Sequence, residues 1–211
     1  MIELHILDAA RRLRPYRRSL KRGFRVARAR VPRLLPVGDV DVVMQELPAL
    51  TIAETGVGGY SPAADILYIY CNPAHPQFGS SLDRELVPMI AHEMLHCVRW
   101  RGPGYGATLG EALVSEGLAM HVEGLFRGHA PFYGTTVDDA GLAKMLERAR
   151  PLFDSTDYGH AAWFIGSEER DIPRYGGYAL GYRIVANGLR RLGLHVAAAW
   201  DRPARDFLSG V

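Results

Sequence analysis

The sequence contains few cysteines and no long apolar run. Its 211 residues include only Cys71 and Cys97, too few for a disulfide framework, so we expect a reducing, cytoplasmic environment. No apolar stretch approaches the ~20 residues that a membrane-spanning helix needs. The N-terminus soon becomes arginine-rich and lacks an apolar segment followed by a small-residue cleavage site, so it does not resemble a secretory signal. These absences predict a cytoplasmic protein without a transmembrane segment.

The overall composition is that of a globular protein, but its charge is unevenly distributed. Hydrophobic residues make up 48% of the chain and charged residues 23%, which are ordinary values for a folded domain. The length suits one domain, or one domain with an appendage. Residues 1–33 hold eleven Arg or Lys against Glu3 and Asp8, whereas the whole chain carries a net charge of +2, so the remainder is acidic.

A basic amphipathic helix is predicted over residues 8–31. Apolar residues recur there at spacings of three and four, with arginines on the other faces, at Leu13, Tyr16, Leu20, Phe24, Ala27 and Val31. The helix can pack this stripe on the domain, serve as an arm for nucleic acid or an anionic membrane, or act as a removable or inhibitory pro-segment. The first reading is favoured, because no RNA-binding signature accompanies the arginines. We expect residues 1–36 to form this helix and a linker, packed on a domain of residues 37–211.

Extended segments are predicted early in that domain. Residues 40–47 and 65–71 are rich in Val, Ile and Tyr and are interpreted as strands, and residues 51–54 as a short third strand. The glycine-rich stretch 56–62 is interpreted as a loop or hairpin turn. An edge strand of such a sheet can either be an ordinary structural strand or pair with an extended peptide.

Helices are predicted in the second half of the chain. One of them ends at the glycines that follow Arg101 and begins either near Ser80 or at Pro88. Thr108 and Glu111 form a capping-box pattern that opens the next helix, and three further helical segments follow at residues 138–149, 158–165 and 178–192. Strands early and helices late predict an α+β fold, with a small antiparallel or mixed sheet followed by a mainly helical half.

The sequence HEMLH at residues 92–96 is the strongest chemical signal. On a helix, His92 and His96 share one face and can bind a single Zn²⁺. Glu93 is rotated by about 100° from His92 and can reach a water on the metal. The alternative reading is a core helix with two buried, hydrogen-bonded histidines. We predict one zinc ion per chain.

A catalytic zinc needs a third protein ligand and an open position. The candidates that follow the motif are Glu111, Glu116, His121, Glu123 and His129. Glu111 is better explained as the capping partner of Thr108. Glu116 lies mid-helix among apolar residues, where a carboxylate is costly to bury unless it is paired or metal-bound. We therefore predict Glu116 as the third ligand, with His121 as a surface or supporting histidine.

These residues resemble the gluzincin metallopeptidases. The HExxH motif and the sequence SEGLA at residues 115–119, in which Glu116 follows His96 after nineteen intervening residues, match their metal helices. Residues 92–123, with WFIG at 163–166 and GYALGYRIV at 177–185, are also similar to a bacterial family of predicted zinc-dependent proteases, first catalogued as a domain of unknown function. The resemblance covers about residues 55–190 and implies a zincin-like fold, with zinc on His92, His96 and Glu116 and with Glu93 as general base.

Two departures from the gluzincin pattern stand out. The aminopeptidase motif GxMEN is absent, and residues 56–60, GVGGY, do not replace it, so capture of a substrate's free α-amine is not supported. Some gluzincins place an aspartate four residues after the glutamate ligand to orient the first histidine. Met120 stands at that position here, so the acceptors for the ligating histidines must come from elsewhere.

A donor to the developing oxyanion is also expected, because peptide hydrolysis places negative charge on the carbonyl oxygen. Tyr178 and Tyr182 lie four residues apart on one predicted helical face, and either is a candidate. The alternative is an aromatic core stripe, and His160 is a further candidate donor.

The leading hypothesis is a zinc peptidase that acts on a peptide or protein substrate, with a Zn²⁺-activated water and Glu93 as general base. The alternative is a non-catalytic or regulatory module with a structural zinc ion, whose basic residues 8–31 contact nucleic acid or a partner protein. A third reading is a zinc hydrolase that acts on a non-peptide amide.

Overall fold

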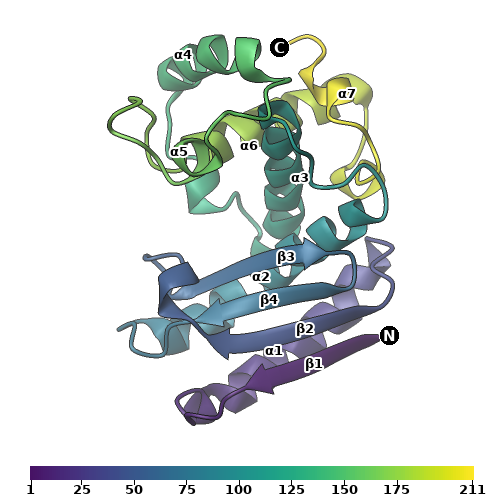
Figure 1. The fold of residues 1–211 in the computed structure, drawn as a ribbon. Helices are drawn as coiled ribbons and strands as arrows, with labels where there is room; N and C mark the ends of the chain where they lie inside the picture. The colour runs from purple at the N-terminus through teal and green to yellow at the C-terminus, as the bar shows by residue number, and fades with distance from the viewer. The chain divides into compact units, whose positions relative to one another are not determined.

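The computed structural model describes all 211 residues and has an α+β fold, as predicted. Residues 1–101 with 125–127 form one compact unit, and residues 102–124 with 128–211 form a second. The first unit contains a four-stranded mixed sheet, and the second is helical (Figure 1). No helix combines the length and the apolar character that crossing a membrane requires.

The sheet of the first unit has the order β1-β2-β4-β3. Its strands are β1 (Ile2–Leu7), β2 (Val40–Glu46), β3 (Val57–Ala63) and β4 (Ile66–Cys71). β1 pairs with β2 and β2 with β4 in parallel, whereas β3 joins β4 antiparallel and lies at the sheet edge. The predictions of strands at 40–47 and 65–71 are confirmed.

Three sequence expectations for this unit were wrong or incomplete. Residues 56–62 form most of β3 rather than a loop, because their glycines sit on an edge strand where close backbone contacts replace side-chain packing. Residues 51–54 form turns and bends instead of a strand. β1 was not anticipated, although Ile2, Leu4 and Ile6 alternate with more exposed residues.

The helix α1 (Arg17–Arg30) connects the parallel strands β1 and β2, since a parallel pair needs a crossover. The 3₁₀ turn at Arg14–Tyr16, which holds Pro15, precedes it. Leu20, Phe24 and Ala27 are buried, and all the basic side chains of residues 11–33 are exposed. A division of the chain at residue 36 into a basic segment and a zincin-like domain stays a prediction.

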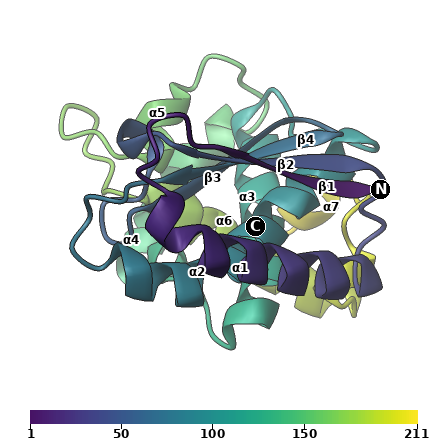
Figure 2. The same ribbon diagram turned by 90° about the horizontal axis from the view of Figure 1, so that it is seen from below.

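The long helix α2 (Phe78–Trp100) carries the HEMLH sequence. It packs beside α1, and Figure 2 shows both helices on the same face of the sheet. α2 begins before Ser80 and continues through Pro88, so the alternative that Pro88 opens the helix was wrong. Pro88 removes one backbone hydrogen bond from the helix. The burial of seventeen residues of α2 compensates for this loss.

The second unit is built on α3 and α6. Its helices are α3 (Leu109–Arg127, whose last turn belongs to the first unit), α4 (Asp139–Ala149), α5 (His160–Phe164), α6 (Gly176–Leu192) and α7 (Arg205–Leu208), with 3₁₀ turns at Phe132–Gly134, Arg150–Leu152 and Val196–Ala198. The predicted capping box is confirmed: Thr108 Oγ1 accepts from Glu111 N at 3.3 Å, and Glu111 Oε2 accepts from Thr108 N at 3.0 Å.

Two glycines allow α3 and α6 to touch through their backbones. A Cβ at Gly117 would overlap Gly181 O and would lie 2.5 Å from Val185 Cγ2. A Cβ at Gly181 would in turn overlap the carbonyl of Leu113. Since real Cβ atoms do not approach so closely, the helix crossing depends on both glycines. Gly117 follows Glu116 directly, so this crossing fixes the helix that carries the predicted third ligand.

The Gly117→Ala variant should lower the free energy of unfolding by about 1–3 kcal/mol, because the added methyl forces the two helices apart. Urea unfolding followed by circular dichroism measures this. Gly124→Ala is the matched control on the same helix, since the nearest atom to its Cβ would be His129 O at 3.4 Å. Equal stability of the two variants would contradict the close crossing.

Candidate metal centre

His92 and His96 lie four residues apart on α2, so their rings are on the same face of the helix. The ring centroids are 4.9 Å apart with an interplanar angle of 69°. Their exposed fractions are only 5% and 4%. Two imidazoles held in this way, away from bulk water, are suited to share one metal ion.

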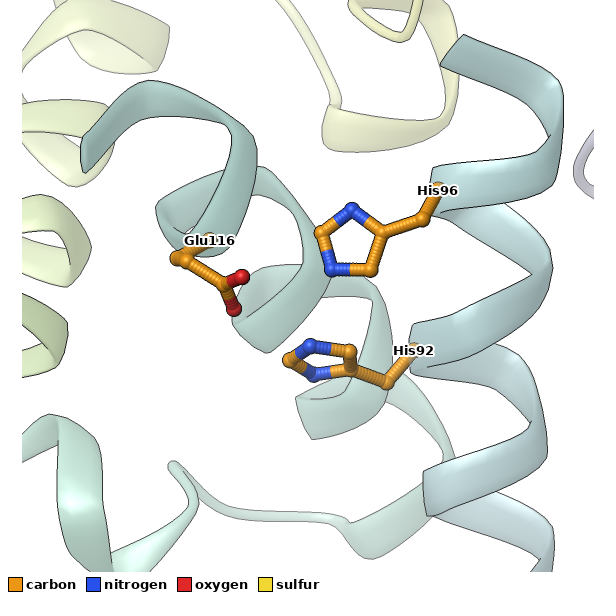
Figure 3. A group of neighbouring side chains, drawn as sticks. All are labelled: His92, His96 and Glu116. Atoms are coloured by element: carbon orange, nitrogen blue, oxygen red, sulfur yellow. The ribbon is translucent and has the colours of Figure 1, made fainter. Parts of the chain in front are cut away.

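Glu116 on α3 completes a buried triad with these histidines. The ligand atoms that His92, His96 and Glu116 offer all lie within 4.8 Å of one another. Figure 3 shows the three side chains directed at one common space. The ligand atoms of a tetrahedral zinc ion are roughly 3–3.5 Å apart, so small side-chain movements would bring the triad onto one ion.

The donor set fits a zinc ion with an open position. Two imidazole nitrogens and one carboxylate match the ligands of catalytic zinc sites, whereas structural sites are closed by four protein ligands. The group has three members, and no fourth Cys, His, Asp or Glu joins it. This metal-binding triad can therefore accept a single ion and leave one coordination position for water or substrate.

The other ligand candidates have different partners. Glu111 serves the capping box. Glu123 is buried and accepts a hydrogen bond from the hydroxyl of Tyr133. His129 Nδ1 lies 2.8 Å from the carbonyl oxygen of Ala130. None of the three belongs to the triad.

His121 also lies outside the triad. Its ring stacks on Tyr182 at a centroid distance of 4.1 Å, and its Nε2 is 3.1 Å from Tyr182 O. Burial lowers the pKa of His121, which favours the neutral ring. These contacts give His121 a packing role on α3.

Glu93 is held against the edge strand β3. Its exposed fraction is 4%, and the hydroxyl oxygen of Ser61 lies 2.9 Å from Glu93 Oε2 and 2.9 Å from the backbone oxygen of Glu93. A Cβ at Gly59 would lie 2.6 Å from Glu93 Cγ, so only glycine lets the strand pass this close. Gly59 and Ser61 share one face of β3, because alternate residues of a strand point the same way. Both residues were missed in the sequence, where they were interpreted as part of a loop.

Tyr105 is the hydrogen-bond partner of Glu116. Its hydroxyl donates to Glu116 Oε1 at 2.8 Å. Burial, followed by the charge of Glu116, raises the pKa of Tyr105 well above its usual value, so the phenol keeps its proton and remains a donor. The hydroxyl of Ser115 donates to Tyr105 O at 2.6 Å, so both the backbone and the side chain of Tyr105 are tied to α3.

Sequence reasoning also missed Tyr105. The one hint in the sequence is that an aromatic residue stands between Gly104 and Gly106, in a stretch whose glycines otherwise indicate only the end of a helix. Gly106 has a φ of 102°, a conformation that L side chains rarely adopt. The loop therefore turns sharply beside Tyr105 before α3 begins.

The predicted oxyanion donors are both on α6. Tyr178 makes edge contacts with Tyr133 and Phe164, at centroid distances of 5.2 and 5.0 Å. It is also one of the groups that raise the pKa of Tyr105, which places it near that phenol. Tyr182 is instead the ring that stacks on His121.

His160, the further candidate, belongs to the same aromatic group. Its ring stacks on Phe164 at 4.5 Å, and its Nδ1 lies 3.0 Å from the hydroxyl of Tyr158. Burial lowers the pKa of His160, although the charge of Glu116 opposes this shift. His160 is thus a largely neutral ring in the vicinity of Glu116.

A comparison with protein-family models agrees with this geometry. Residues 30–209 match a family described as predicted Zn-dependent protease (DUF2268). No curated protein and no solved structure matches the chain. The matched region contains the whole triad and Glu93, and it extends beyond the residues on which the resemblance was first noted. The chain belongs to this family of predicted zinc-dependent proteases.

Proposed function

We propose that the protein is a zinc-dependent peptidase of gluzincin type that hydrolyses peptide bonds with Glu93 as general base. The observation that carries this proposal is the buried triad of His92, His96 and Glu116, with Glu93 next to the first ligand. Three ligands leave the open position that a hydrolytic site needs. The family implies a protein substrate. Cys71 and Cys97 are both free, which is in keeping with a reducing cytoplasm.

The chain's residues divide the chemistry among themselves. His92, His96 and Glu116 would hold the ion, which when bound lowers the pKa of a water to about 7 and polarises the scissile carbonyl. Glu93 takes a proton from the attacking water and then delivers it to the leaving amine. Ser61 binds the carboxyl group of Glu93, and Gly59 leaves the space in which the Glu93 side chain lies against β3.

We propose two further contributions to catalysis. β3 is an edge strand, so an extended substrate can pair with it and lie beside Glu93. Tyr178 is the favoured oxyanion donor over Tyr182, because it neighbours Tyr105 whereas Tyr182 stacks on His121. A structural zinc site would need a fourth protein ligand, and the triad has three members.

The Glu93→Gln variant should lose peptide hydrolysis by at least ~100-fold and still bind zinc, because the amide keeps the shape of the side chain but is not a base. Peptide cleavage assays and metal analysis of the same preparation measure the two properties. Full activity in a zinc-loaded Glu93→Gln protein would exclude the general-base role.

The Glu116→Gln variant should weaken zinc binding by at least ~100-fold. This effect should exceed the one caused by removing a residue that only hydrogen-bonds to a metal ligand. Glu123→Gln is the matched control: Glu123 is also buried on α3 and also accepts from a tyrosine hydroxyl. Competition with a chelating dye measures both affinities. If Glu116→Gln retained one zinc ion per chain at the chelator concentrations at which the control also retains it, Glu116 would be rejected as a ligand.

The Tyr105→Phe variant should weaken zinc binding by roughly 10–100-fold, because it removes the hydroxyl that orients Glu116. Tyr133→Phe, which removes the corresponding hydroxyl from Glu123, is the control and should leave the affinity unchanged. The same dye competition applies. Equal affinities of the two variants would show that Tyr105 does not support the ligand.

A further inference from the structure

The edge strand β3 contains a β-bulge next to Glu93. Its pairing with β4 is regular through Tyr60, opposite Tyr68, and resumes at Ala63, opposite Ile66. Two residues of β3, Ser61 and Pro62, therefore face a single residue of β4. Proline is tolerated in a sheet at such positions, and bulges redirect side chains next to active sites. Here the bulge includes Ser61.

The bulge is fixed to α2 at two points. Trp100, about one helical turn beyond His96 on α2, donates its Nε1 hydrogen to the backbone oxygen of Ser61 at 3.0 Å. The side chain of Ser61 points to Glu93, and the exposed fractions of the two residues are 6% and 4%. A hydroxyl and a carboxylate buried together form a charge-assisted hydrogen bond, which is stronger than one between neutral groups.

The hydroxyl of Ser61 has two acceptors at the same distance. Glu93 Oε2 and the backbone oxygen of Glu93 are each 2.9 Å from Ser61 Oγ, but the single hydroxyl hydrogen can be donated fully to only one of them. Both acceptors belong to Glu93, so whichever of them receives the hydrogen, Ser61 stays in contact with the backbone and the carboxyl group of the same residue.

We infer that Ser61 is a positioning residue that holds the carboxyl group of Glu93 in place throughout the hydrolytic cycle. The inference rests on the proposed function, since it assigns Ser61 to the proton transfer of that reaction. Ser61 acts through Glu93, because its hydrogen bond limits rotation of the Glu93 side chain.

A purely structural role makes a different prediction. If Ser61 only fastens β3 to α2, its removal lowers the stability of the protein and leaves the turnover of the folded enzyme unchanged. If Ser61 positions Glu93, its removal lowers kcat, while KM and the zinc content stay the same. The two roles are therefore separated by kinetics on the folded, zinc-loaded protein.

The test compares Ser61→Ala with Ser81→Ala in the full chain. Ser81 is also a buried serine of the first unit, and its hydroxyl has no hydrogen-bond partner. Ser61→Ala should lower kcat by about 10–100-fold, in line with the loss of a hydrogen bond to a charged group, with one zinc ion per chain and an unchanged KM. Ser61→Thr, which keeps the hydroxyl, should restore most of the turnover. A kcat of zinc-loaded Ser61→Ala within twofold of the Ser81→Ala value would overturn the inference.

A second measurement is independent of activity. A double-mutant cycle of Ser61→Ala and Glu93→Ala, followed by urea unfolding of the zinc-free protein, measures the interaction of the two side chains directly. We expect the folding equilibrium constant of the double variant to differ by roughly fivefold or more from the product of the single effects. Additive effects would overturn the inference even if the enzyme is active. The proposed function fails in a different way. If the two substitutions are coupled but the zinc-loaded wild-type protein cleaves no peptide, the contact of Ser61 with Glu93 stands and the peptidase function is rejected.

Discussion

The structure depends on the burial of two carboxylates, Glu93 and Glu116. Each is almost inaccessible to water, and a carboxylate in an apolar interior is unstable unless hydrogen bonds or opposite charges compensate for its lost hydration. Each accepts a hydrogen bond from a hydroxyl of its own compact unit: Glu93 from Ser61, and Glu116 from Tyr105. A metal ion on the triad would add positive charge beside Glu116. Each of the two carboxylates is therefore supported by a hydroxyl of its own unit.

Glycine determines how closely the backbone can approach these carboxylates. Gly59 lets β3 pass against the side chain of Glu93, and Gly117 lets α6 touch α3 directly after Glu116. A methyl group at Gly117 would meet the backbone of α6, and one at Gly59 would displace the buried side chain of Glu93 itself. The residues that hold the site are thus partly residues without side chains, and their contribution lies in the geometry that they allow.

The sequence predicts best what depends on neighbours along the chain. The spacing of His92 and His96, the capping box that removes Glu111 from the ligand candidates, and the strands at 40–47 and 65–71 all follow from local patterns. The edge strand β3 escaped prediction because Gly56 to Pro62 have the composition of a turn, and it is their pairing with β4 that makes them a strand. The contact of Ser61 with Glu93 joins residues 32 positions apart, so no spacing rule could reveal it.

Ser61 and Tyr105 each offer a neutral hydroxyl to a buried carboxylate, and this has a chemical consequence. An arginine beside Glu93 would orient it as well as a hydroxyl does, but its full charge would stabilise the carboxylate and make it a weaker base. A hydroxyl directs the carboxyl group with a dipole, adds no net charge, and can reverse from donor to acceptor when the carboxyl group gains a proton. The phenol of Tyr105 likewise orients Glu116 without competing with a cation for its charge. The hydroxyls of Ser61 and Tyr105 thus help to orient the two carboxylates and add no net charge of their own.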